Sequence, residues 1–119
     1  MSNILLIDDD DSTRTAIRAM LKTVGHSVAE ASSADAGLAS YQQHRADVVI
    51  MDLLMPGKNG LDTIKEFISK DPQVKIIAIS ASGLDYLSWA EKHGAKSSLA
   101  KPFMREHLIK TVQQVIDQP

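Results

Sequence analysis

Acidic residues follow two apolar runs of the sequence at positions where they could bind a cation or attack phosphorus. Asp8 and Asp9 come directly after the run Ile4–Ile7, and Asp52 comes directly after a run that ends at Met51. Neighbouring carboxylates repel each other, which favours a bound cation between them. Because these positions offer oxygen donors alone, the cation would be a hard one. Mg²⁺ fits best, since it accepts a few carboxylates and keeps water molecules that a phosphate can displace.

A hydroxyl and an ammonium group stand at the ends of two further expected strands. Ser80 ends the run that starts at Val74, and Lys101 follows Ser97–Ala100. A carboxylate beside a divalent cation stays ionised and can act as a nucleophile toward phosphorus. A metal, a lysine and a hydroxyl around Asp52 are the groups needed to neutralise and orient a phosphoryl group. The combination therefore predicts phosphoryl-transfer chemistry centred on Asp52.

Each of these residues alone also has a simpler structural interpretation. An isolated Asp52 would be a cap at a strand end, Ser80 a strand terminus and Lys101 a solvated lysine. For Asp10 and Asp11, which complete the acidic run, we prefer the structural interpretation. They come at the start of an expected helix, where negative charge is favourable against the helix dipole.

Five short apolar runs alternate with segments of helical periodicity, a pattern that predicts a parallel sheet with helices on both faces. In such a series all strand-to-helix loops gather at the carboxyl edge of the sheet, where ligands bind. The functional residues above would meet there. The expected strands are 4–7, 28–31, 47–51, 74–79 and 97–100. A helix is expected after each strand. The apolar face of the first carries Ala16, Ile17, Met20, Leu21 and Val24, and that of the second, capped by Ser32 or Ser33, carries Ala36, Leu38, Ala39 and Tyr41. The third carries Leu61, Ile64, Phe67 and Ile68, the fourth spans 84–93, and the last carries Leu108, Ile109, Val112, Val115 and Ile116.

Composition limits the classes of protein that fit. The 119 residues, 44% of them hydrophobic and 24% charged, are typical of one globular domain over 1–119. A net charge of −2 implies no field for binding nucleic acid or a membrane surface. The absence of cysteine excludes disulfides, thiolate metal sites and cysteine catalysis, and no signal or membrane-spanning segment is visible. We therefore expect a cytoplasmic protein. The four histidines share no spacing typical of a zinc site.

Taken together, these motifs resemble the response-regulator receiver domains of two-component signalling, similar to the chemotaxis single-domain type. The resemblance covers the whole chain and implies a doubly wound, flavodoxin-like (βα)5 fold with five helices and strand order 2-1-3-4-5. It is carried by Asp8-Asp9, by Asp52-Leu53-Leu54-Met55-Pro56 with Gly60, by Ser80-Ala81 and by Lys101-Pro102-Phe103.

The resemblance also implies a role for each matching residue. Asp52 would accept a phosphoryl group from a sensor histidine kinase or a histidine phosphotransfer protein. The protein would then be a switch rather than an enzyme, limited to its own phosphorylation and dephosphorylation, and read by an output domain or partner that the sequence does not identify. The matching residues are Asp8, Asp9, Asp52 and the backbone carbonyl of Leu54 for Mg²⁺, Ser80, the backbone amide of Ala81 and Lys101 for the phosphoryl group, and Pro102 for a cis peptide bond.

The chain departs from the family pattern at three places. Ser98 stands where receivers often carry an aromatic switch residue, and 95–98 lacks the acidic pair of receivers that dimerise through this region, so we do not expect that dimer. Leu54 and Ser82 occupy the two positions that border the path of the hydrolytic water in the family. We hypothesise that an apolar Leu54 slows autodephosphorylation.

Three alternatives remain at this stage. The Ser98 substitution keeps open a degenerate receiver that acts as a protein-interaction module, and Tyr86 and Trp89 could belong either to a core or to a partner surface. Asp8-x-Asp10 resembles the nucleophile motif of haloacid-dehalogenase phosphohydrolases, but too few acidic residues follow Lys101 to complete that site. A flavodoxin-like cofactor binder would need a loop rich in Gly, Ser and Thr after the first strand, where this chain has carboxylates.

Overall fold

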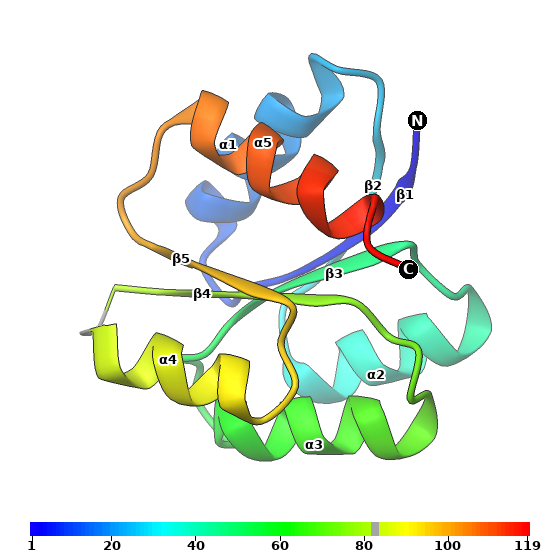
Figure 1. Ribbon diagram of the computed structural model, residues 1–119, viewed down its shortest axis with the longest axis vertical. Coiled ribbons are helices and arrows are strands. Elements are labelled where there is room, and N and C mark those ends of the chain that lie inside the picture. Colours follow the sequence, from blue (N-terminus) through cyan, green and yellow to red (C-terminus); the bar gives the residue numbers. More distant parts are fainter. Residues whose placement is uncertain (82–83) are drawn as a thin grey trace.

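The computed structural model describes residues 1–81 and 84–119, in which strands and helices alternate along the chain. The strands form one parallel sheet with the order β2-β1-β3-β4-β5, which confirms the predicted doubly wound fold (Figure 1). The elements in chain order are β1 (Asn3–Ile7), α1 (Asp11–Lys22), β2 (Ser27–Ala31), α2 (Ala34–Gln43), β3 (Val48–Asp52), α3 (Gly60–Lys70), β4 (Ile76–Ser80), α4 (Leu84–Lys92), β5 (Ser97–Ala100) and α5 (Arg105–Ile116).

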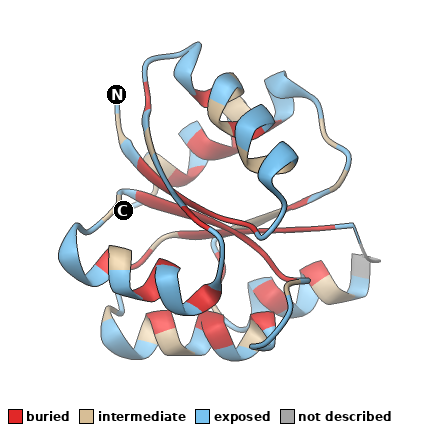
Figure 2. Ribbon diagram, turned by 180° about the vertical axis from the view of Figure 1, so that it is seen from behind, coloured by how far each residue is buried: buried red, intermediate tan, exposed pale blue. Residues whose placement is uncertain are grey.

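Helices cover both faces of the sheet. Helices α1 and α5 lie on one face, and α2, α3 and α4 lie on the other (Figure 1). Every residue of β3 and β4 is buried, as Figure 2 shows for the centre of the sheet. A strand covered on both faces has no solvent side, which explains why these segments are continuous apolar runs rather than alternating ones. None of the helices in the described ranges is long and apolar enough to cross a membrane.

Polar side chains mark the starts of three helices. The Ser33 hydroxyl accepts a hydrogen bond from the Ala36 amide and so caps α2, and Asn59 caps α3 in the same way through the Leu61 amide. Asp10 occupies the capping position of α1, but its carboxylate accepts from the Thr13 hydroxyl at 2.5 Å rather than from a backbone amide. The acidic run therefore charges the start of α1, as predicted, without a capping bond from Asp10.

The structure corrects some predicted bounds and faces. Helix α1 ends at Lys22, so Val24 lies beyond it and is exposed, and Ala16 is exposed as well. Strand β4 begins two residues later than predicted, because Val74 donates its backbone N–H to Asp71 in the turn that precedes the strand. Strand β3 runs one residue further, through Asp52.

Candidate functional site

The residues with chemical potential meet at the carboxyl edge of the sheet. Asp8 directly follows β1, Asp52 and Ser80 are the last residues of β3 and β4, and Lys101 directly follows β5. The register places Asp52 beside Ile79, the residue before Ser80, and Ser80 beside Ala100, the residue before Lys101. Parallel pairing of neighbouring strands therefore carries these side chains to one region, as the sequence pattern predicts.

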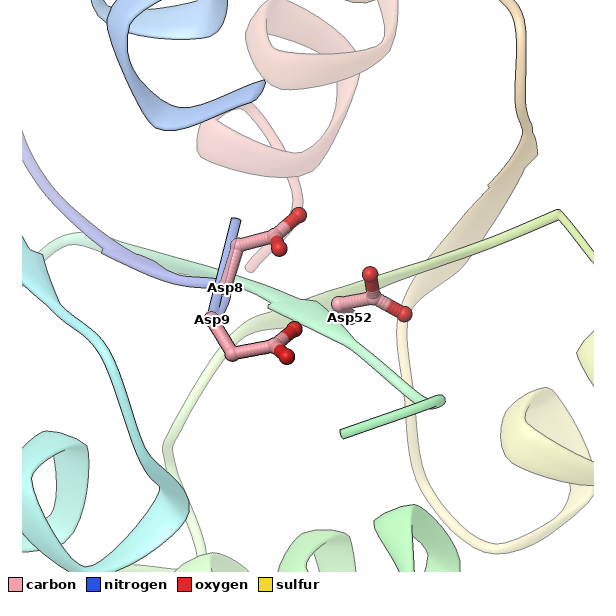
Figure 3. A group of neighbouring side chains, drawn as sticks. All are labelled: Asp8, Asp9 and Asp52. Carbon is pink, nitrogen blue, oxygen red and sulfur yellow. The ribbon is translucent and has the colours of Figure 1, made fainter. Parts of the chain in front are cut away.

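Three carboxylates form the centre of this region. Asp8 and Asp9 extend from the end of β1 toward the side on which Asp52 lies (Figure 3). One carboxylate oxygen from each lies within 4.8 Å of those of the other two. Asp8 is fully buried and Asp52 is 5% exposed, whereas Asp9 is exposed to solvent. The cluster thus opens to water on the Asp9 side.

Lys101 bridges the two buried carboxylates. Its Nζ donates to Asp52 Oδ2 at 2.7 Å and to Asp8 Oδ2 at 3.0 Å. The second oxygen of each carboxylate accepts from a backbone amide, Asp52 Oδ1 from Leu54 at 2.8 Å and Asp8 Oδ1 from Asp10 at 2.9 Å. Both carboxylates are therefore fixed in orientation at both oxygens.

The charges in the cluster do not balance. Burial raises the pKa of Asp52, and the nearby Asp8 carboxylate adds to the rise, while the hydrogen bonds from Lys101 and the Leu54 amide oppose it. Burial alone would lower the pKa of Lys101, but its hydrogen bonds to Asp52 and Asp8 outweigh this effect and raise it. One ammonium group thus faces three carboxylates, so the region has an excess of negative charge.

The donor set fits a hard divalent cation. Carboxylate oxygens are the ligands that Mg²⁺ prefers, and the excess negative charge would offset the loss of part of the cation's hydration. The exposure of Asp9 leaves a route for the cation and its waters. The backbone carbonyl of Leu54 belongs to the loop that directly follows Asp52 and is a possible further oxygen donor.

The other residues singled out in the sequence are placed around this cluster or away from it. Ser80 is fully buried, Ala81 beside it is exposed, and Leu54 is 48% exposed. The Lys101–Pro102 peptide bond is cis, the geometry that the resemblance implies. Ser82 lies outside the described residues.

The face built from α4 and β5 carries a hydrogen bond between these two elements and an exposed aromatic side chain. The Ser98 hydroxyl donates to the Glu91 carboxylate, which links β5 to α4. Leu87 is buried and Tyr86 half-buried, but Trp89 is 56% exposed. Tyr86 packs against the core that contains Leu87, so the core interpretation holds for Tyr86 and is wrong for Trp89 alone.

Arg14 is a residue near the site that sequence reasoning did not single out. Its Nη1 donates to the backbone carbonyl of Asp8 at 2.5 Å. No spacing rule indicates this contact, because the acceptor is a main-chain atom and a second partner, Glu30, lies far along the chain on β2.

The fold and the site together define a class of protein, a doubly wound α/β domain with an acidic cluster and a lysine at its ligand-binding edge. Residues 4–113 match the model of the response regulator receiver domain. The chain is 34% identical to protein PilH of Pseudomonas aeruginosa over 98% of both chains, and 34% identical to chemotaxis protein CheY of Thermotoga maritima over 94% of this chain and 95% of that one. The crystal structure of a response regulator receiver domain protein from Clostridium thermocellum is similar with a TM-score of 0.92 at 32% identity, covering 98% of this chain and 95% of that one.

The chain belongs to the response regulator receiver domain family. It is therefore a phosphoacceptor regulator of two-component signalling rather than an enzyme in the usual sense. This assignment replaces the phosphohydrolase and the cofactor-binder interpretations.

Proposed function

We propose that this chain is a Mg²⁺-dependent switch in which Asp52 takes a phosphoryl group from the phosphohistidine of a sensor kinase or a histidine phosphotransfer protein. The observation that supports it best is the buried Asp52 carboxylate, held by Lys101 at 2.7 Å within an acidic cluster whose oxygens lie within 4.8 Å of one another. A carboxylate that is fixed at both oxygens and faces a cation-binding cluster is suited to attack on phosphorus.

The transfer exchanges one bond to phosphorus for another. A P–O bond forms to Asp52 while the P–N bond of the donor phosphohistidine breaks, and the leaving imidazole is protonated from solvent. Asp8, Asp9, Asp52 and the Leu54 carbonyl would hold Mg²⁺, which when bound supplies positive charge for the carboxylates and the phosphoryl oxygens. The Lys101 ammonium already lies beside Asp52 and would pair with a phosphoryl oxygen.

The end of β4, next to Asp52, would transmit the effect of phosphorylation to the surface. Ser80 is the last residue of β4, the strand paired with β3, and Ala81 directly follows it, so a small shift of their loop would let the Ser80 hydroxyl and the Ala81 amide bond a phosphoryl group on Asp52. That shift would alter the adjoining α4 and β5, where Ser98 and Glu91 are hydrogen-bonded.

A second candidate function is a receiver that acts as a protein-interaction module without phosphorylation. It is favoured by the exposed Trp89 and by Ser98, which stands where other receivers often carry an aromatic residue.

A single domain over 1–119 and a cytoplasmic location stay predictions of the sequence.

Phosphorylation by a small phosphoramidate donor tests the proposed roles, because its P–N bond resembles that of phosphohistidine. With MgCl₂ we expect the wild type to gain one phosphoryl group by intact mass, and Asp9→Asn and Lys101→Met to react at least about tenfold more slowly, a barrier increase of roughly 1.4 kcal/mol. Asp62→Asn, an exposed carboxylate in the first turn of α3, is the matched control and should react at the wild-type rate. Wild-type rates in both site variants would contradict the proposal, provided that their circular dichroism shows a folded protein.

A further inference from the structure

The side chain of Arg14 in α1 connects the loop after β1 to strand β2. Its Nη1 donates to the Asp8 carbonyl at 2.5 Å and its Nε donates to Glu30 Oε1 at 3.2 Å. The remaining terminal nitrogen, Nη2, pairs with the Asp11 carboxylate. The Arg14 side chain is 14% exposed, so this guanidinium is packed into the fold rather than displayed on its surface.

The carbonyl that Arg14 holds belongs to the peptide group that joins Asp8 to Asp9. The orientation of this peptide plane determines where the Asp9 carboxylate lies relative to that of Asp8. The same short segment is held from its other side by the Asp8 amide, which donates to the Ala31 carbonyl of β2 at 3.1 Å. Arg14 therefore acts on the backbone between two of the three clustered carboxylates.

We propose that Arg14 is a positioning residue for the cation site, which it keeps in a binding-competent arrangement by bridging the Asp8 carbonyl to Glu30. The proposal rests on the Mg²⁺ site of the proposed function. Groups that orient metal ligands without touching the metal commonly change metal affinity by about 10–100-fold when they are removed. The bridge needs a guanidinium, because a lysine offers one nitrogen where Arg14 uses three.

The direction in which Mg²⁺ affinity changes when Arg14 is removed distinguishes a positioning role from a simple effect of charge. Arg14 is positively charged, and a positive charge near a cation site opposes cation binding. If charge alone mattered, removal of Arg14 would strengthen Mg²⁺ binding. If Arg14 positions the Asp8–Asp9 peptide, its removal weakens Mg²⁺ binding despite the favourable change in charge.

Arg18, one turn further along α1, is a matched control. Its Nη1 donates to Glu30 Oε2 at 2.6 Å, so it shares the anchor of Arg14. In the described residues its hydrogen bond goes to Glu30 and not to the Asp8 carbonyl. Arg18→Met thus removes the same charge and a bond to the same glutamate, but leaves the contact with the loop after β1.

The experiment is a titration of each protein with MgCl₂, followed by amide chemical shifts of ¹⁵N-labelled protein or by calorimetry. We expect the Kd of Arg14→Met to rise by about tenfold, while Arg18→Met keeps the wild-type affinity or binds slightly more tightly. Arg14→Lys retains the charge and should also bind more weakly than the wild type. Thermal unfolding in EDTA reports whether each variant is folded without the cation, and Arg14→Lys carries the test if Arg14→Met is not folded.

An unchanged or lowered Kd in the Arg14 variants would overturn the proposal, and so would an equal rise in Arg14→Met and Arg18→Met. A wild type that shows no Mg²⁺ binding, or binding that Asp9→Asn leaves intact, would instead contradict the proposed function. The two failures are therefore distinguishable.

Discussion

At the scale of single residues, the site depends on one lysine shared by two buried carboxylates. Lys101 bonds both Asp8 and Asp52, yet burial still raises the pKa of Asp52. The ammonium therefore compensates the negative charge of the cluster in part. Because negative charge remains uncompensated, a further positive charge would stabilise the cluster. This is the electrostatic reason why a divalent cation, and phosphoryl chemistry that uses one, suit the site.

Leu54 gives a prediction about how long the phosphoryl group lasts. Its amide donates to Asp52, so the residue borders the acceptor, while its 48% exposed side chain has no group that could bond a water molecule. We expect Leu54→Asn to shorten the lifetime of the phosphorylated protein by about threefold to tenfold, roughly 0.7–1.4 kcal/mol in the activation free energy of hydrolysis. The decay is followed by intact mass after removal of the phosphodonor.

Val24→Asn is the control for this measurement, since Val24 is a similarly exposed apolar residue, 40% exposed, in the turn before β2. It should leave the lifetime unchanged. An unchanged lifetime in Leu54→Asn would mean that the side chain does not control the attacking water.

Most of the site could be predicted from the sequence, but Arg14 could not. Asp8, Asp52, Ser80 and Lys101 each lie at the carboxyl end of a strand that the sequence predicts, and the geometry of parallel sheets then brings them together. The contact of Arg14 with the Asp8 carbonyl depends instead on the packing of α1 against β2, and a main-chain acceptor leaves no mark in the sequence.

At the scale of elements, the start of α3 is packed directly against the loop that follows the acceptor. A Cβ atom at Gly60 would lie 2.7 Å from the Leu53 carbonyl oxygen and 2.8 Å from the Leu53 Cα, both backbone atoms. We expect Gly60→Ala to lower the free energy of unfolding by about 1–3 kcal/mol, because the backbone must shift to admit the methyl group. Urea unfolding measures this change.

Gly57→Ala is a useful comparison because it changes a different property. Gly57 has φ +93° and open space around its Cβ position, so alanine there would be strained by its backbone alone, by about 1–2 kcal/mol. Gly60→Ala, unlike Gly57→Ala, should also slow phosphorylation, because the methyl group displaces Leu53, which directly follows Asp52. Wild-type stability in Gly60→Ala would show that the loop yields without cost.

The elements themselves were predictable to the extent that large apolar residues mark them. Strands β1, β3 and β4 follow from the continuous apolar runs that they contain, whereas β2 and β5 include polar residues. Ile17 and Leu21 define the buried face of α1. Alanine is a weaker marker of a buried helix face than a large apolar residue. Ala16, Ala36 and Ala39 are exposed, although the helical periodicity placed them on the apolar face. Gly37 is buried because α2 approaches β1 so closely that a Cβ would lie 2.3 Å from Ile7 Cδ1. Such close approach is a tertiary property that no local pattern reveals.

At the scale of the whole molecule, the sheet separates two hydrophobic cores and carries the site at one edge. The opposite edge holds a buried histidine, His26, whose Nδ1 accepts from the Ser2 amide at 3.1 Å. Burial lowers the pKa of His26, and the N-terminal ammonium adds to the lowering. The other charged groups that line the adjoining cavity are Lys110 and Asp117 of the α5 region.

This histidine predicts a pH dependence of global stability. Because the pKa is lower in the folded than in the unfolded state, the neutral form favours folding, and its contribution is complete above the unfolded value of about 6.5. The free energy of unfolding should therefore fall as the pH decreases through about 6.5 toward the folded pKa. His26→Gln should flatten this part of the urea-unfolding profile, whereas His44→Gln, at an exposed position, should not. An equal slope in the wild type and His26→Gln would assign the pH dependence to other groups.

The measurement that tests the central claim most directly is the intact mass of the protein after incubation with acetyl phosphate, with and without Mg²⁺, for the wild type and for Asp52→Asn. We expect the wild type to gain one labile phosphoryl group when Mg²⁺ is present, and neither the wild type without Mg²⁺ nor Asp52→Asn to gain one. The absence of any gain in the wild type would favour the interaction module, and a gain that persists in Asp52→Asn would contradict Asp52 as the acceptor and move the nucleophile to Asp8 or its neighbours.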